Sequence, residues 1–404
     1  MQSRSGGRSF WYSVRLVLFV VIGLVLGERA SHWDVWIDAR YRIFRLLQQA
    51  LPGSPYVRET AVVLIGDDEY WRELRPYGTR GWGTFIADLL TALDAINPAV
   101  IVLDFDWRSP VPSSATSSTQ SPPLNNEVGA LTAAIEHVSR QRSIVLPQTI
   151  ERDEDGQYIL GRDVLGQIVF GDTGHIVRGY IALPKDMRRI PGQIRIRSGE
   201  IVDSLAMAAA RARTPNAVDR VFPTREAPFA GYFSRRDFDG RVIAAGDLMR
   251  NPSAYRQQIA FNIVIVGGAW HTRAHGQGPT VDAYDTPVGR LDGALIHANY
   301  TEAFLDRRVY SSVRHWAAIL VETVLIVVVA LIFALQRRWM VRLSQLASVF
   351  VIACLFAYVM FINFHQFFDP LIPLLAVVAH AVFEQVVEWR SEARHRQRDR
   401  SASC

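Results

Sequence analysis

The longest apolar runs of the sequence lie in its last quarter. Residues 316–335 contain one charged side chain, Glu322, and are long enough to cross about 30 Å of hydrocarbon as a helix. Runs 343–362 and 367–387 are similar in length and apolarity, and a shorter run, 11–27, lies near the N-terminus. The pattern therefore predicts four transmembrane helices, three of them close to the C-terminus.

The N-terminal run, 11–27, has two interpretations. Arginines before a short apolar run are typical of cleaved signal peptides and of uncleaved signal anchors. Residues 25–27 (Val-Leu-Gly) make a poor small-x-small cleavage site, and the run begins with Trp11, an aromatic residue suited to the membrane interface. We therefore favour an uncleaved anchor over residues 11–27, with cleavage as the alternative.

The arginines of the short connecting segments predict the orientation. Three arginines follow the second predicted span and five lie in 388–404, whereas residues 363–366, between the third and fourth predicted spans, contain none. Under the positive-inside rule, arginine-rich segments stay in the cytoplasm. We therefore expect cytoplasmic tails at 1–10 and 388–404, and a large exported segment, 28–315, on the other side of the membrane.

The exported segment alternates short apolar runs with helical patterns. Runs 61–65, 100–103 and 262–266 are continuous and rich in β-branched residues, as strands buried on both faces of a parallel sheet are. Helical spacing of apolar residues marks 31–50, 85–96, 127–140, 202–213 and 291–305. We predict an α/β domain with a mostly parallel sheet flanked by helices, in which the three runs are adjacent central strands. Residues 168–170 and 175–183 are predicted to form a hairpin.

Composition narrows the function classes. The chain is 49% hydrophobic and 21% charged, which excludes collagen-like and disordered classes. Its net charge of +5 comes from the two ends, because residues 28–315 contain 33 basic and 33 acidic residues. A neutral exported segment lacks the basic surface that nucleic-acid binding needs. Both cysteines, Cys354 and Cys404, lie outside this segment, so its core must form without a disulfide.

Four carboxylates follow the first two predicted strands of the exported segment: Asp67, Asp68, Asp104 and Asp106. Ligands of open α/β sheets sit outside the carboxyl ends of the strands. These acids, with Arg80 nearby in the sequence, are therefore candidates to bind a hard cation, or the amino or hydroxyl groups of a ligand. The alternative is that they cap helices and pair with arginines such as Arg80 and Arg108.

No catalytic, metal or cofactor pattern stands out elsewhere in the exported segment. Gly267 and Gly268 follow a predicted strand without the G-x-G-x-x-G fingerprint, so a structural tight turn is the simpler interpretation. Three histidines, His271, His275 and His297, could gather with Asp282 or Asp285 as a metal site, but their spacing matches no zinc pattern. We therefore favour isolated surface histidines, with His297 on a helix that faces the sheet. Serines 204 and 234 lack a nucleophile elbow. We therefore expect neither enzyme activity nor a bound metal or cofactor.

Glu322 is the one ionisable residue of the second predicted span. A carboxylate at that depth is costly unless it is neutral or paired. Glu322 is therefore a candidate to transmit a signal within the membrane or to recruit a partner helix. The alternative is that it is protonated, or hydrogen-bonded to a serine or tyrosine of a neighbouring span.

Several segments, taken in order, resemble the type-two CHASE domain, an extracellular sensory module of bacterial cyclases and histidine kinases. The segments are AVVLIGDDEY (61–70), AVIVLDFDW (99–107), GDTGHIVRGY (171–180), NIVIVGGAW (262–270) and DTPVGRLDGALIHANY (285–300). The resemblance covers roughly residues 30–310, and the three predicted spans after it match the family layout. It implies a multi-pass receptor of the bacterial plasma membrane whose periplasmic domain senses an unknown signal. Family members continue into a cyclase, kinase or phosphatase domain, whereas about 16 residues follow Glu388 here.

Our leading hypothesis is a sensor or receptor subunit without catalytic output of its own. It would sit in the lipid bilayer and signal through a separate membrane or cytoplasmic protein, with a homodimer as one arrangement and no nucleic-acid partner. One alternative is a scaffold that holds an envelope complex without sensing anything. A weaker alternative is an exported hydrolase that depends on carboxylates.

Overall fold

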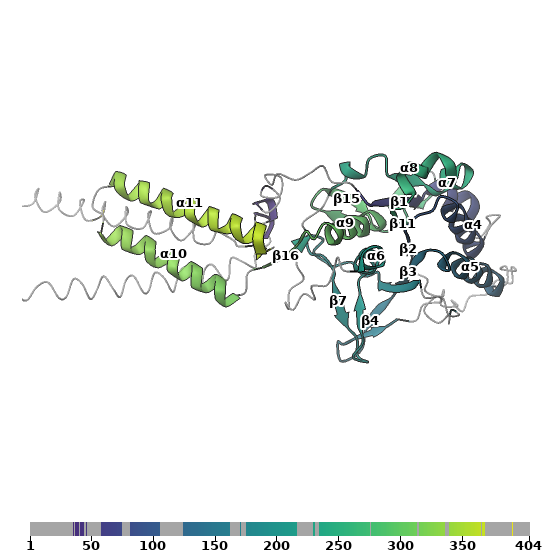
Figure 1. Cartoon of the computed structure of the whole chain (residues 1–404), viewed down its shortest axis with the longest axis horizontal. Coiled ribbons are helices and arrows are strands. Elements are labelled where there is room, and N and C mark those ends of the chain that lie inside the picture. The colour runs from purple at the N-terminus through teal and green to yellow at the C-terminus, as the bar shows by residue number, and fades with distance from the viewer. Residues whose placement is uncertain are drawn as a thin grey trace, which may run out of the picture. The chain divides into compact units, whose positions relative to one another are not determined.

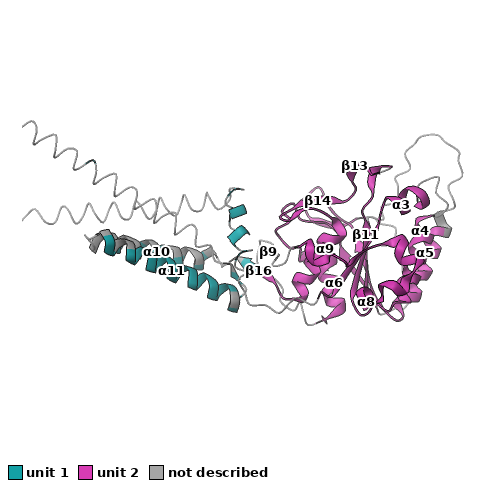
Figure 2. Ribbon diagram, turned by 90° about the horizontal axis from the view of Figure 1, so that it is seen from above, with its two compact units in different colours: residues 1–52, 310–404 teal, residues 53–309 magenta. Residues whose placement is uncertain are grey.

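The computed structural model describes the following residues: 35, 37–39, 41–43, 46, 58–74, 81–105, 124–161, 170, 175–215, 229–230, 234–274, 276–312, 315–335, 339–364, 366–367 and 390. The chain divides into two compact units (Figures 1 and 2). One unit comprises Met1–Pro52 and Tyr310–Cys404, and the other is Gly53–Val309. We describe each unit by itself.

The unit Gly53–Val309 is built on a six-stranded, fully parallel sheet. Its strands, in spatial order, are β10 (Val242–Ala244), β1 (Thr60–Ile65), β11 (Ile263–Gly268), β2 (Val100–Asp104), β3 (Ser143–Gln148) and β6 (Ile176–Tyr180). Residues Val62, Ile265 and Val102 lie level with one another across the three central strands. The prediction that 61–65, 262–266 and 100–103 are adjacent central parallel strands is therefore confirmed.

Helices cover both faces of this sheet, as Figure 2 shows for α4 and α5 on one side and α6 and α9 on the other. The first face carries α4 (Trp82–Asp94), α5 (Leu124–Ser139), α7 (Ala245–Arg250) and α8 (Arg256–Ile259). The second face carries α6 (Leu205–Arg213) and α9 (Gly293–Leu305). Successive residues of β1 alternate between the faces: Val62 packs with α6 and α9, and Val63 with α4. Both faces of the central strands are buried against helices, which explains why these strands consist of continuous apolar runs.

Short elements connect these layers. They are α3 (Asp67–Glu69), the π-helical turn η1 (Tyr70–Leu74), β9 (Phe229–Ala230), the 3-10 turns η3 (Arg236–Phe238) and η4 (Pro252–Tyr255), and four antiparallel hairpins. The hairpins are β4 (Ile150–Arg152) with β5 (Tyr158–Leu160), β7 (Gln193–Arg195) with β8 (Ile201–Asp203), β12 (His271–Arg273) with β13 (Gln277–Thr280), and β14 (Ala283–Thr286) with β15 (Gly289–Asp292).

The structure differs from the predicted hairpin of 168–170 with 175–183 in the pairing of the second arm. Strand β6 lies within the second arm, but it pairs in parallel with β3. Residues 168 and 169 lie outside the described part of the chain. The glycine-rich turn sequence at 171–174, between two apolar runs, suggested a hairpin. The same pattern is equally compatible with a crossover connection, so it did not distinguish the two.

The other unit contains two long helices, α10 (His315–Leu335) and α11 (Trp339–Phe364). Strands β16 (Val309–Ser312) and β17 (Gln366–Phe367) pair in parallel, and the rings of Tyr310 and Phe361 stack with centroids 4.4 Å apart. Eight described residues between 35 and 46 are helical, in agreement with the helix predicted over 31–50.

The predicted transmembrane topology is only partly represented among the described residues. Within them, one helix is long and apolar enough to cross a membrane, and its window is Ser344–Phe361 with a mean hydropathy of 2.0. The run 316–335 is helical, as α10. The run 11–27 and nearly all of 367–387 lie outside the described residues. A parallel α/β domain is thus established, while four transmembrane helices remain a prediction.

Candidate functional site

The connections of the central strands change sides of the sheet at the carboxyl end of β11. The chain leaves β1 and β2 toward α4 and α5 on one face of the sheet, and leaves β11 toward α9 on the other face. Where neighbouring strands of an open α/β sheet send their connections to opposite faces, a crevice opens outside the carboxyl ends, and ligands bind there. We call the residues at this end of β1, β11 and β2 the carboxyl edge.

Gly267 and Gly268 end β11 and let two other parts of the chain approach it. A Cβ atom at Gly267 would lie 2.6 Å from the Cβ atom of Ala294 in α9, and a Cβ atom at Gly268 would overlap the indole of Trp270. Both glycines belong to the strand itself. The tight-turn interpretation is therefore wrong: these positions are glycine because a helix and an indole pack directly on the strand end.

Asp104, the last residue of β2, is a buried carboxylate that faces α9. Its side chain is 6% exposed, and its Oδ1 atom lies 3.6 Å from Nε2 of His297, whose side chain is 2% exposed. Burial raises the pKa of Asp104 to about 7, and burial lowers the pKa of His297 to about 4. The arrangement favours a neutral acid beside a neutral imidazole. The predicted orientation of His297, on a helix facing the sheet, is confirmed.

Asp282 adds a second partly buried carboxylate at the same edge. Its backbone has a φ of +61°, which lets its carbonyl accept the N–H of Gly293 at the start of α9 at 2.7 Å. The hydroxyl of Tyr284 donates to Oδ1 of Asp282 at 2.9 Å. Burial, together with the nearby charge of Asp104, raises the pKa of Asp282 to about 6. Gly293 must be glycine because a Cβ atom there would overlap the Asp282 carboxylate.

Asp67, after β1, is held by His271. The backbone N–H of His271 donates to Oδ1 of Asp67 at 2.7 Å, and its Nδ1 atom lies 2.8 Å from Oδ2. Burial acts to raise the pKa of Asp67, but the hydrogen bonds from His271 outweigh it and lower the pKa overall. His271 is therefore a partner of a predicted site residue, and the expectation of an isolated surface histidine is wrong.

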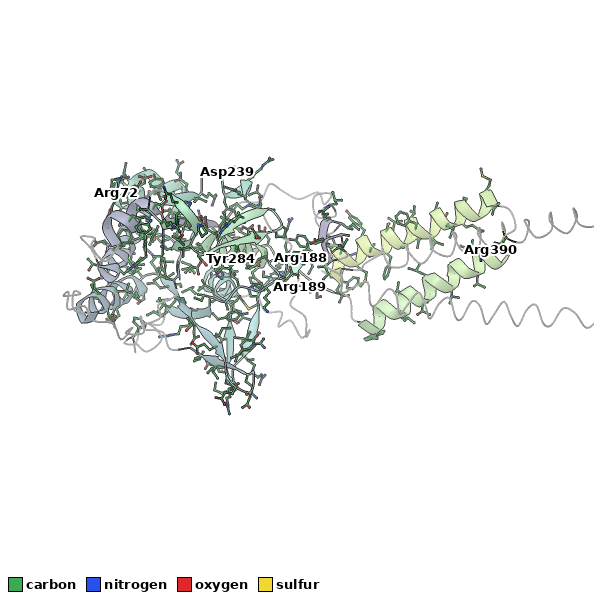
Figure 3. All side chains as sticks on the ribbon, turned by 180° about the vertical axis from the view of Figure 1, so that it is seen from behind. Arg72, Arg188, Arg189, Asp239, Tyr284 and Arg390 are labelled. Atoms are coloured by element: carbon green, nitrogen blue, oxygen red, sulfur yellow. The ribbon has the colours of Figure 1, made fainter. Side chains whose placement is uncertain are left out.

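The two acids after Asp67 have structural roles. Asp68 is 79% exposed and pairs at 3.3 Å with the equally exposed Arg72, which Figure 3 labels. Such a surface pair contributes little. Glu69 is buried and accepts the N–H groups of Gly66 and Gly246 at 3.0 and 2.8 Å, so it ties the start of α3 to α7. The acidic run thus divides into three residues with different tasks.

Four aromatic side chains gather at the carboxyl edge: Tyr70, Trp82, Phe105 and Trp270. The rings of Tyr70 and Trp270 stack with centroids 4.4 Å apart and an interplanar angle of 5°. The sequence interpretation missed this cluster. The available signal was that an aromatic residue follows each of the three central strands within five positions.

The predicted binding set is therefore only partly placed. Asp67 and Asp104 both lie at the carboxyl edge, each next to its own histidine, while Asp68 faces solvent. Arg80, Asp106, Arg108 and His275 lie outside the described residues. Among residues that the structure does describe, no group of three or more His, Cys, Asp or Glu side chains is arranged to hold a metal ion. Glu322 lies in α10, and its side chain is not described.

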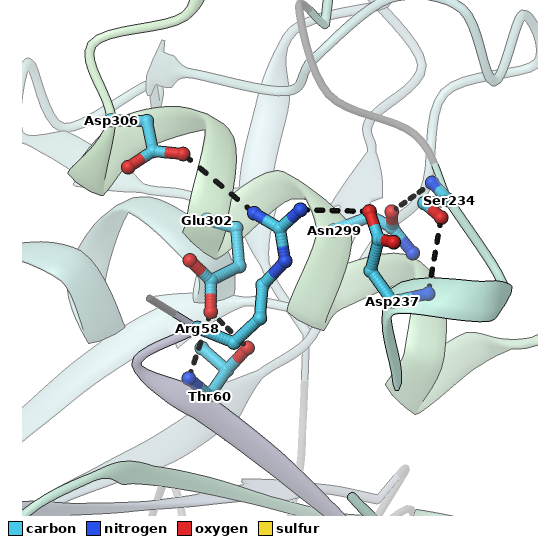
Figure 4. Close-up of polar contacts among 7 residues, drawn as sticks. All are labelled: Arg58, Thr60, Ser234, Asp237, Asn299, Glu302 and Asp306. Carbon is cyan, nitrogen blue, oxygen red and sulfur yellow. Dashed lines mark hydrogen bonds and ion pairs between the residues drawn. The ribbon is translucent and has the colours of Figure 1, made fainter. Parts of the chain in front are cut away.

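A second polar cluster lies at the opposite end of the sheet, where the chain enters β1 and leaves α9 (Figure 4). Arg58, with its side chain 8% exposed, lies 2.7 Å from Asp237 and 3.9 Å from Asp306. Both the backbone N–H and the hydroxyl of Thr60 donate to Oε1 of Glu302, at 2.8 and 2.7 Å. We call these five residues the amino-edge network.

The amino-edge network keeps ionisable groups inside the unit. Burial raises the pKa of Glu302 despite the hydrogen bonds from Thr60, and burial raises the pKa of Asp306 despite the charge of Arg58. Asn299 extends the network, because its Oδ1 atom accepts the N–H of Ser234 at 2.7 Å. Glu302 and Asp306 lie four residues apart at the end of a predicted helix, which was the only sequence signal for this network.

Comparison with known families identifies the family of this chain. The chain matches the family model described as the CHASE2 domain over residues 16–335, most of its length. No curated protein and no solved structure matches it. CHASE2 domains are extracellular sensory domains, so the predicted resemblance to the type-two CHASE family is confirmed. This chain, with its parallel α/β sheet, belongs to the CHASE2 family.

Proposed function

We propose that this chain is a non-catalytic sensor subunit of a bacterial plasma membrane. In this proposal the unit Gly53–Val309 lies outside the cytoplasm and receives a signal at the carboxyl edge. The change passes along α9 to the membrane helices and then to a separate partner protein. Membership of a sensory family supports the sensing role, and the change of connection side at the carboxyl edge, beside the buried acids Asp104 and Asp282, supports the place at which the signal is received.

Helix α9 carries the proposal. Twelve of its thirteen residues are buried, so the helix has little freedom to move without moving its neighbours. Near its start His297 faces Asp104, and near its end Glu302 accepts both hydrogen bonds from Thr60. One packed helix therefore links the carboxyl edge to the amino-edge network. The chain then continues through β16 into α10.

The test changes the packing of α9 at the carboxyl edge and measures amide hydrogen exchange at the amino-edge network. In Gly267→Ala, the new Cβ atom would meet Ala294 at 2.6 Å, so α9 must shift. We expect faster amide hydrogen exchange at residues 58–60 and 302–308 in the full chain, reconstituted in lipid nanodiscs. Unchanged exchange there, with a measurable change around residue 294, would show that α9 does not transmit.

The matched control is Gly129→Ala in α5, where a new Cβ atom meets nothing within 4 Å. We expect this variant to leave exchange at the amino-edge network unchanged. The scaffold alternative differs in the same experiment, because a scaffold needs no coupling between the two edges. Purification with fixed partners, together with unchanged exchange in Gly267→Ala, would favour the scaffold.

Glu322 belongs to the same proposal as the contact between α10 and a partner helix. An intramembrane carboxylate is expensive unless it is neutral or paired, and a partner with a hydrogen-bond donor would satisfy it. Its position seven residues into α10 places it on the helix that directly follows the sensing unit.

A further inference from the structure

Asp104 is a buried carboxylate for which the described residues provide no cationic partner. Its Oδ2 atom makes no hydrogen bond among the described residues, although the side chain is only 6% exposed. In the part of the chain that the structure describes, the nearest basic group is Nε2 of His297, which lies 3.6 Å from Oδ1 and is too far for a hydrogen bond. An unpaired charge in such a place is strongly disfavoured, so the carboxyl group needs a positive charge or a proton.

The surrounding groups make the charge imbalance larger. Strand β2 contributes Asp104, the turn before β14 contributes Asp282, and Asp292 precedes α9, so three acids face the start of this helix. Asp282 interacts with Asp104, His297 and Asp292. Three basic side chains act on Asp292, at the outer side of the cluster: Arg235, Arg290 and His271. His297 is thus the basic group that faces the inner pair of acids.

We propose that the ligand of this site is the proton: Asp104 and Asp282 together hold a proton in the folded protein and release it when the medium outside the cytoplasm becomes alkaline. The inference deepens the proposed function and rests on it, because it names the signal that the carboxyl edge receives. A proton needs no cavity, which fits a side chain buried as deeply as Asp104.

The titration of the cluster agrees with this assignment. Burial raises the pKa of Asp104 to about 7, and burial with the charge of Asp104 raises the pKa of Asp282 to about 6. Burial lowers the pKa of His297 to about 4, so the imidazole stays neutral over the range in which the acids titrate. His297 therefore does not neutralise the pair, and the proton does.

The geometry also provides a route for the proton. Tyr284, labelled in Figure 3, is 37% exposed, and its hydroxyl donates to Oδ1 of Asp282. Asp282 is less buried than Asp104 and holds the first N–H of α9 through its carbonyl. Loss of the proton places two like charges beside the start of α9, and their repulsion acts on the segment that anchors this helix.

The decisive variant is Asp104→Asn, which keeps the shape of the protonated acid and has no proton to lose. In the full chain in nanodiscs, we expect the wild type to lose a protonated-carboxyl C=O band, seen by infrared difference spectroscopy, between about pH 5 and about pH 8. The variant should show a smaller band, because it lacks the Asp104 carboxyl group while Asp282 still titrates. Its melting temperature should fall less than that of the wild type over the same interval, because the folded wild type loses protons that the unfolded chain has already released.

Asp68→Asn is the control, because Asp68 is exposed and paired with Arg72. It should keep the band and the wild-type fall in melting temperature. A band of undiminished size in Asp104→Asn, or one that is absent from the wild type at about pH 5, overturns the proposal. If Asp104→Asn does not fold, Asp282→Asn is read in the same way, and a wild-type band unchanged by it overturns the shared proton. Faster exchange at the amino edge in Gly267→Ala, without the band, would leave a sensor whose ligand is not the proton.

Discussion

Glu302 is a buried carboxylate whose two hydrogen bonds come from a single residue. The N–H and the hydroxyl of Thr60 both bind its Oε1 atom, and burial still raises the pKa of Glu302. At the other end of α9, no described residue donates to the Oδ2 atom of Asp104. The difference explains why we assign a structural task to the first acid and proton binding to the second: satisfied buried groups hold a fold together, whereas unsatisfied ones need a partner.

Removal of the Thr60 hydroxyl tests this structural task. Thr60→Val keeps the β-branched shape of a fully buried strand residue but takes one donor from Glu302. We expect the free energy of unfolding to fall by about 1–3 kcal/mol, because a buried carboxylate loses a hydrogen bond that nothing replaces. Denaturant unfolding of the full chain measures the change. Thr60→Ser retains the hydroxyl and should lose less, and equal losses in both variants would point to packing alone.

At the scale of elements, the contact between Asp67 and His271 joins the end of β1 to β12. Asp67→Asn should lower the free energy of unfolding near pH 7 by about 1 kcal/mol, because the amide is a weaker acceptor for His271. The pKa of Asp67 is lowered in the folded protein, so its stabilisation is present above the ordinary value of 3.8 and is lost as the pH falls through the folded value.

The pH series of Asp67→Asn therefore has a definite shape. The difference in melting temperature from the wild type should shrink as the pH falls from about 7 toward the lowered pKa of Asp67, because the wild-type side chain then becomes neutral like that of the variant. A difference that is constant over this range would mean that the charge of Asp67 is not what His271 stabilises. This trend is opposite in sign to that of Asp104, whose raised pKa makes the folded protein lose stability as the pH rises.

The sequence predicted the central strands better than the edges. Strands β1, β2 and β11 are buried on both faces, so their continuous apolar runs are unambiguous. The edge strand β10 has three residues, two of them exposed, and carries too little pattern to be recognised. Helix α9 has no polar face, because residues 181–190 cover its outer side, where the hydroxyl of Tyr300 donates to the carbonyl of Met187.

The sequence predicted the two strand-end acids of the candidate site but not the histidines that contact them. Asp67 and Asp104 follow apolar runs, so their place at the carboxyl edge could be inferred from sequence. Their partners His271 and His297 come more than 190 positions later, through β11 and α9. Nothing local in the sequence relates such distant residues, since their contact depends on β11 lying between β1 and β2. Asp282 was considered only as a possible metal partner of the histidines and then set aside, because its backbone geometry, and not its neighbours in sequence, brings it to the site.

For the whole molecule, the arginine asymmetry predicts both termini in the cytoplasm. Reporter fusions at Ser401 and Ala227 should therefore report opposite sides of the membrane. A fusion at Asn363, in the arginine-free connection, should report the same side as Ala227. If Ser401 and Ala227 report the same side, the predicted topology is wrong, and the proposed route from an external signal to an internal partner fails with it.

The ion pair between Arg58 and Asp306, 3.9 Å long, has a consequence for how this unit can be combined with others. It brings the first described residue of the unit next to the last turn of its final helix, so both attachment points lie together. A domain with adjacent ends can be inserted between two neighbouring segments of another protein without increasing the distance between those segments. The unit Gly53–Val309 is therefore suited to insertion as a domain. We expect the segment bounded just outside Arg58 and Asp306 to fold when it is inserted into proteins whose flanking helices are unrelated to those of this chain.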